Sequence, residues 1–103
     1  MRDIKEKAKE YDRLMEILWR DLEKAMNNPE AKANWLGPLA VQYYQEAKKF
    51  LLKYSPSLRP DQFDLLFLKK PIGDLSREEL RKWRWNVARI RGCLRSFLKN
   101  KNK

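Results

Sequence analysis

Residues 80–99 carry a cluster of arginine and tryptophan side chains that could bind a negatively charged partner. The stretch reads LRKWRWNVARIRGCLRSFLK, and no acidic residue follows Glu79 in the chain. Arginine binds phosphate through paired hydrogen bonds and stacks on aromatic rings, and an exposed tryptophan can stack on a base. This combination of residue types is typical of surfaces that contact nucleic acid.

Residue types that commonly support catalysis are scarce. The chain has no histidine, three glycines and one cysteine, Cys93. The usual zinc sites and histidine-based triads are therefore excluded, and no glycine-rich phosphate loop or nucleophile elbow is present. Arginine neighbours would lower the pKa of the Cys93 thiol, but without a partner base we interpret it as a residue on a helix face. We expect a protein that is not an enzyme and has no metal or cofactor.

The positive charge is concentrated near the C-terminus. Of the net +10, residues 76–103 contribute ten basic and two acidic side chains, whereas residues 1–36 carry eight of each. A length of 103 residues fits a single domain over 1–103. The basic residues at about 100–103 are expected to form a disordered tail.

Apolar periodicity predicts a first long helix at about 2–26. Apolar residues recur there at alternating spacings of four and three, which places them on one side of a helix. They are Ile4, Ala8, Tyr11, Met15, Leu18, Leu22 and Ala25.

Two further helices are predicted between the proline and glycine breaks of the middle region. One runs over about 38–54 and has an aromatic-rich face of Ala40, Tyr43, Tyr44, Ala47, Phe50, Leu51 and Tyr54. The other is short, over about 60–68, and is expected to turn Phe63, Leu66 and Phe67 inward.

The last helix, at about 76–98, has the clearest start signal. Ser76 and Glu79 have the spacing of a capping box, and Leu75 and Leu80 have that of a hydrophobic staple. Its core face is predicted to contain Leu80, Trp83, Val87, Ile90, Leu94 and Phe97 or Leu98. With no strand-like alternation elsewhere, the fold class is all-α: a small single-domain helical bundle of three long helices and one short.

The opposite face of this helix is the predicted binding surface. Trp85 lies about 200° round the helix from Trp83, so one tryptophan is expected in the core and the other outside. Neighbouring cations along a helix repel one another when no acidic residue lies between them, and a bound polyanion would offset that repulsion. The predicted nucleic-acid-binding residues are Arg81, Lys82, Arg84, Trp85, Arg89, Arg91, Arg95 and Lys99. Secondary candidates are Lys48, Lys49, Lys53, Lys69 and Lys70.

These features favour a nucleic-acid-binding protein or an accessory subunit of a nucleoprotein complex. Contact is expected mostly with phosphates, because Asn86 is the only amide or hydroxyl residue in the first half of the helix after its cap. DNA and RNA both remain open, with single strands slightly preferred. The alternative is an adaptor that docks an acidic protein. In outline the chain is also similar to helical coat or packaging proteins of viruses and to small subunits of RNA-guided surveillance complexes, which favours other protein subunits as partners.

No membrane partner is expected. The longest apolar run is Leu65–Leu68, far below the roughly 20 residues that span a bilayer. A single cysteine and no secretory leader favour a cytoplasmic, nucleoid-associated or nuclear protein that is not secreted.

Overall fold

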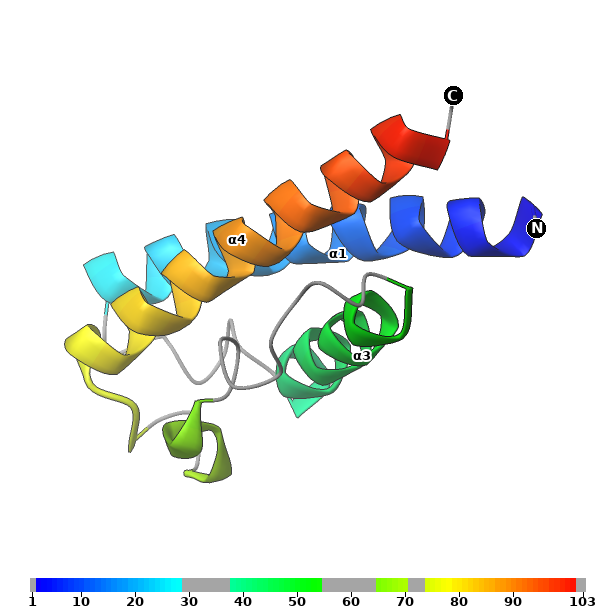
Figure 1. Ribbon diagram of the computed structural model, residues 1–103. Coiled ribbons are helices and arrows are strands. Elements are labelled where there is room, and N and C mark those ends of the chain that lie inside the picture. The colour runs from blue at the N-terminus through cyan, green and yellow to red at the C-terminus, as the bar shows by residue number, and fades with distance from the viewer. Residues whose placement is uncertain (1, 29–37, 55–64, 71–73, 102–103) are drawn as a thin grey trace.

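A computed structural model of the chain describes residues 2–28, 38–54, 65–70 and 74–101. These residues form three α-helices, α1 (Arg2–Asn27), α3 (Pro38–Tyr54) and α4 (Arg77–Lys101), and the short 3₁₀ helix η3 (Leu66–Lys69). None of the described residues forms a strand. The predicted all-α class is therefore confirmed (Figure 1).

The helix boundaries agree closely with the predicted ones, with differences at two places. α4 continues through Lys101, so residues 100 and 101 of the predicted tail are helical. Of the short helix predicted at 60–68, residues 60–64 lie outside the described part. The described residues that follow form the 3₁₀ helix Leu66–Lys69 instead of an α-helix. At its start, the Leu68 N–H donates a hydrogen bond to the Leu65 carbonyl at 3.2 Å. Pro71 comes two residues after the end of this helix, and the residue before a proline is disfavoured in the α conformation, which explains why the helix stays short.

The two longest helices, α1 and α4, lie side by side and antiparallel. The N-terminal end of α1 and the C-terminal end of α4 lie at the same end of the molecule, and α3 packs against both helices (Figure 1). This arrangement leaves one long side of α4 without a covering helix among the described residues.

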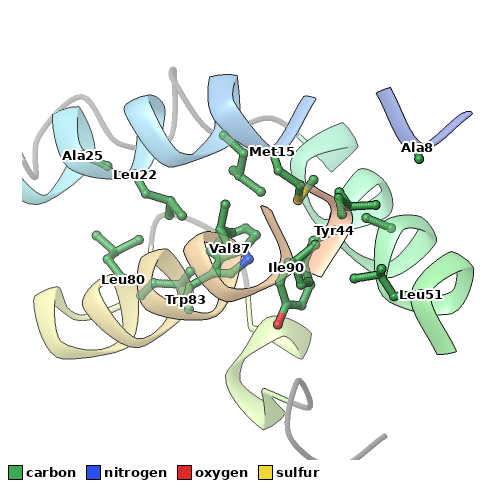
Figure 2. Packing of buried hydrophobic residues seen from close by; sticks show 14 of the residues in the cluster. Ala8, Met15, Leu22, Ala25, Tyr44, Leu51, Leu80, Trp83, Val87 and Ile90 are labelled. Carbon is green, nitrogen blue, oxygen red and sulfur yellow. The ribbon is translucent and has the colours of Figure 1, made fainter. Parts of the chain in front are cut away.

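The core lies where the apolar faces of the three helices meet, as Figure 2 shows. Most of the predicted apolar residues of α1 and α4 are buried there, because helical spacing aligns them on one side, and Ile4 and Tyr11 are partly buried against this core. The buried apolar side chains of these helices are Ala8, Met15, Leu18, Leu22 and Ala25 from α1, Tyr44, Ala47 and Leu51 from α3, and Leu80, Trp83, Val87, Ile90, Leu94 and Phe97 from α4.

Aromatic contacts attach α3 to the other two helices. The ring centroid of Phe50 lies 5.4 Å from that of Tyr11 in α1 and 5.6 Å from that of Phe97 in α4. Tyr44 meets Trp83 edge to face, with centroids 6.1 Å apart and planes at 86°. Edge-to-face pairs add about 0.5–1.5 kcal/mol beyond the area that they bury. The aromatic-rich face of residues 38–54 therefore packs against other helices, as predicted.

Gly92 is expected to lower the stability of α4. It is exposed within the helix, and a Cβ atom added to it would meet nothing within 4 Å. Glycine costs a helix interior about 0.5–1 kcal/mol relative to alanine. Gly92→Ala is therefore expected to raise the free energy of unfolding by that amount, measured by urea denaturation. Ala88→Gly, one turn earlier on the same exposed side, is the reverse control and is expected to lower it. A loss of stability in Gly92→Ala would contradict the open surroundings of this glycine.

Candidate nucleic-acid interface

The start of α4 is held by the capping box that the sequence predicts. The backbone N–H of Ser76 donates to Glu79 Oε1 at 2.9 Å, and the backbone N–H of Glu79 donates to Ser76 Oγ at 3.1 Å. Lys70 Nζ also donates to Glu79 Oε2 at 2.9 Å. These interactions, first the hydrogen bond from the Ser76 backbone and then that from Lys70, lower the pKa of the Glu79 carboxyl. The cap fixes where the helix begins and hence which side chains face outward.

The two tryptophans of the WRW stretch lie on opposite sides of α4. Trp83 has no exposed surface, whereas Trp85 is 68% exposed. The separation of about 200° between residues i and i+2 places one in the core and the other in solvent. This prediction from the helix phase is confirmed.

Six of the eight predicted binding residues are exposed along α4. They are Arg81, Lys82, Trp85, Arg89, Arg95 and Lys99. Arg81 Nη2 lies 3.0 Å from Glu78 Oε1 one turn earlier, but both side chains remain more than half exposed. A pair of this kind contributes little to stability, so it leaves the arginine available to a stronger acceptor.

For the other two residues, Arg84 and Arg91, the predicted position on the outer face is wrong. Both lie half-buried against α1 instead of on the outer face. Arg84 is 28% exposed, with its Nη2 atom 3.7 Å from Glu23 Oε2 and its guanidinium carbon 4.1 Å from the ring centroid of Trp19. Arg91 is only 17% exposed, and its Nε atom lies 3.5 Å from Asp12 Oδ1.

Acidic residues of α1 therefore offset part of the positive charge on α4. Asp12 Oδ1 also lies 3.6 Å from Arg95 Nε, so one carboxylate faces two guanidiniums. Neither Asp12 Oδ1 nor Arg91 Nε has a hydrogen-bond partner among the described residues, so the contact between them is electrostatic. The expectation that the cations lack acidic neighbours holds within α4 after Glu79, but it is wrong for the side that faces α1.

The secondary lysines all lie outside α4. Lys48 is half-buried, and Lys49 and Lys53 are exposed. The latter two line a depression of about 450 Å³ between α1 and α3, together with Tyr11 and other residues of these helices. Lys69 and Lys70 are exposed before α4, but the ammonium of Lys70 is paired with Glu79.

A groove beside the outer face was not predicted from the sequence. It has a volume of about 490 Å³ and is lined by Trp19, Glu78, Arg81, Lys82, Arg84, Trp85 and Ala88. The missed residue is Trp19, which comes from α1. Helical spacing could have indicated its position, because Asp12, Trp19 and Glu23 lie together on one side of α1, next to the apolar residues.

Three further findings concern the cysteine, metal ligands and membranes. Burial raises the pKa of the Cys93 thiol, and Arg89 opposes this shift more weakly, so its arginine neighbours do not lower this pKa overall. The described residues contain no group of three or more histidine, cysteine, aspartate or glutamate side chains placed to hold a metal ion. No described helix is both long and apolar enough to cross a membrane.

The fold and its surface thus define a small all-α domain with a basic, tryptophan-bearing helix face. Comparison with protein families, with curated proteins and with solved structures found no match for the chain.

Proposed function

We propose that this protein binds nucleic acid without catalysis, alone or as an accessory subunit of a nucleoprotein complex. The observation that carries the proposal is the outer face of α4, where arginine and lysine side chains surround the exposed Trp85. Clustered cations on one side of a domain with a pI near 9.9 are the electrostatic feature of nucleic-acid-binding proteins.

Most phosphate contacts are assigned to the most exposed cations of α4. Lys82, Arg89 and Lys99 are exposed, and Arg95 is 63% exposed although it shares Asp12 with Arg91. Arg84 and Arg91 contribute less to the outer surface because Glu23 and Asp12 offset their charges. The surface is therefore smaller than the sequence alone predicts.

Binding is proposed to be largely independent of sequence. Asn86, the amide that α4 offers in its first half, is buried at 7% exposure and cannot reach a base edge. Arginine and lysine on an open helix face contact mainly phosphates, which carry no sequence information.

A salt titration tests this proposal. If about four phosphates are contacted, the logarithm of the binding constant should fall with the logarithm of salt concentration with a slope of about −3 to −4 on duplex, and somewhat less steeply on single strands. Fluorescence anisotropy with labelled oligonucleotides of random sequence measures both slopes. The absence of binding at low salt would contradict the proposal.

The second candidate function is an adaptor that docks an acidic protein. The exposed Trp85 among arginines favours it, because tryptophan and arginine are enriched among the residues that dominate protein–protein binding energy. This candidate predicts weak oligonucleotide binding at every salt concentration and salt-dependent binding of an acidic peptide instead.

A further inference from the structure

The groove between α1 and α4 combines two indole rings with three cations. Trp19 reaches it from α1 and Trp85 from α4, and Arg81, Lys82 and Arg84 also line it. Its one acidic residue, Glu78, is paired with Arg81 at 3.0 Å. The volume of about 490 Å³ lies within the roughly 300–1,000 Å³ typical of small-ligand sites.

Trp85 contributes a large aromatic surface to this groove without contributing to the core. Three large apolar side chains are exposed among the described residues, and Trp85 is the most exposed of them at 68%. The other two, Ile17 and Leu39, do not line the groove. The burial of an exposed indole under a flat ligand would remove apolar area from water and add a stacking interaction.

Arg84 is held in place in the groove with unused hydrogen-bonding capacity. Its guanidinium stacks on Trp19 at 4.1 Å, which fixes the side chain before any ligand arrives. The 3.7 Å between its Nη2 atom and Glu23 Oε2 is too long for a hydrogen bond, so the capacity for a ligand lies at this end of the guanidinium, while its unpaired Nε atom is buried. A cation positioned in this way loses little side-chain entropy when it binds an anion.

We propose that this groove binds one unpaired nucleobase of a single-stranded nucleic acid. The base stacks on Trp85, the adjoining phosphate is held by Arg84, and Lys82, which also lines the groove, adds positive charge. A base within a duplex is already stacked on its neighbours, so only a single strand offers a free face to the indole. The inference rests on the proposed function and adds the class of ligand and its site.

An acidic peptide would satisfy the cations of the groove but would leave the exposed ring of Trp85 without a matching flat partner. A nucleotide supplies both a planar π-system and a phosphate, so it matches the aromatic and the cationic residues together. The small side chain of Ala88, which also lines the groove, leaves room for such a ring.

The test compares two ligands of equal charge. Oligothymidylate and an abasic oligomer of the same length carry the same phosphates, so the ratio of their dissociation constants reports base contacts alone. We expect wild-type protein to bind oligothymidylate about 10-fold more tightly than the abasic oligomer, measured by fluorescence anisotropy.

Four variants locate the base contact. Trp85→Leu keeps an apolar side chain but removes the aromatic ring, so it should bring the ratio close to one, while Trp85→Phe should keep much of it. Ala88→Leu should fill the groove and should also bring the ratio of the two dissociation constants close to one. Its matched control is Ser96→Leu, about two turns further along the exposed side of α4 and outside the groove, which should leave the ratio unchanged. Circular dichroism checks that each variant is folded.

The outcomes separate this inference from the proposed function. Equal, salt-dependent binding of both ligands by the wild type would overturn the base site and leave phosphate binding intact. A ratio of about 10 that survives both Trp85→Leu and Ala88→Leu would place the base elsewhere and overturn the groove assignment. The binding of neither oligomer at low salt would overturn both proposals, and tighter binding of an acidic, tyrosine-containing peptide would assign the groove to a protein partner.

Discussion

Replacement of Trp83 by alanine is expected to cost about 3–5 kcal/mol of unfolding free energy, enough to unfold a small domain of marginal stability. The side chain is completely buried where α1, α3 and α4 meet, and its ring packs edge to face on Tyr44 (Figure 2). Its removal leaves a cavity that the neighbouring helices can only partly close. Urea denaturation followed by far-UV circular dichroism measures the loss.

The same substitution two residues further along is the matched control. Trp85→Ala removes an identical side chain from an exposed position and is expected to change stability by less than about 0.5 kcal/mol. Trp83→Phe adds a second comparison: it keeps an aromatic ring and removes an indole N–H that has no hydrogen-bond partner among the described residues. It should cost less than alanine, because the phenyl ring fills part of the cavity that alanine leaves, and in both variants no unsatisfied indole donor remains buried. A destabilised Trp85→Ala beside a silent Trp83→Ala would contradict the orientation of α4.

The second large effect is expected on binding. The double variant Lys82→Glu/Arg89→Glu should weaken oligonucleotide binding by about 100-fold at low salt, since each charge-assisted contact contributes about 1.5 kcal/mol. The salt dependence should also become shallower by about one unit of slope for each lost phosphate contact. Both side chains are exposed, so the unfolding free energy should change by less than about 1 kcal/mol. Anisotropy titrations and urea denaturation measure the two quantities.

A matched double variant on α1 controls for net charge. Arg13→Glu/Lys24→Glu changes the charge of the protein by the same amount, at two exposed positions of the other long helix. By helical spacing these positions lie on the side of α1 that faces away from α4. If both double variants weaken binding equally, the effect comes from overall charge and the assignment of the contacts to α4 is wrong.

Arg84 and Arg91 are unsuitable for the same experiment. A glutamate at either position would face Glu23 or Asp12 across the contact between α1 and α4. Such a change would lower stability as well as binding, and the two effects could not be separated.

The local features of this protein were predictable because they depend on residues close together in the chain. The boundaries of α1 and α3 and the opposite positions of Trp83 and Trp85 follow from helical periodicity. The start of α4 follows from the three-residue spacing of Ser76 and Glu79, which is confirmed by two hydrogen bonds.

The candidate site was only half predictable from the sequence. The outer cations of α4 and Trp85 were identified from their positions on one helix. The pairing of Arg91 with Asp12 and of Arg84 with Glu23 was not, because periodicity within a helix shows which residues share a face but not which neighbouring helix lies beside that face. The groove was missed for the same reason, since Trp19 and Trp85 come from different helices.

The sequence by itself determined the all-α class, the apolar faces of the long helices, the capped start of α4 and the concentration of positive charge at the C-terminal end. These depend on side-chain spacing and on local hydrogen bonds. Only the tertiary structure decided which cations remain on the surface and which are offset. The antiparallel packing of α1 on α4 brings acids and arginines together that lie far apart along the chain, and it places Trp19 under the guanidinium of Arg84. The physical reason is that buried apolar area sets how the two helices pack, and the charges at the edges of that contact take the partners that this packing provides.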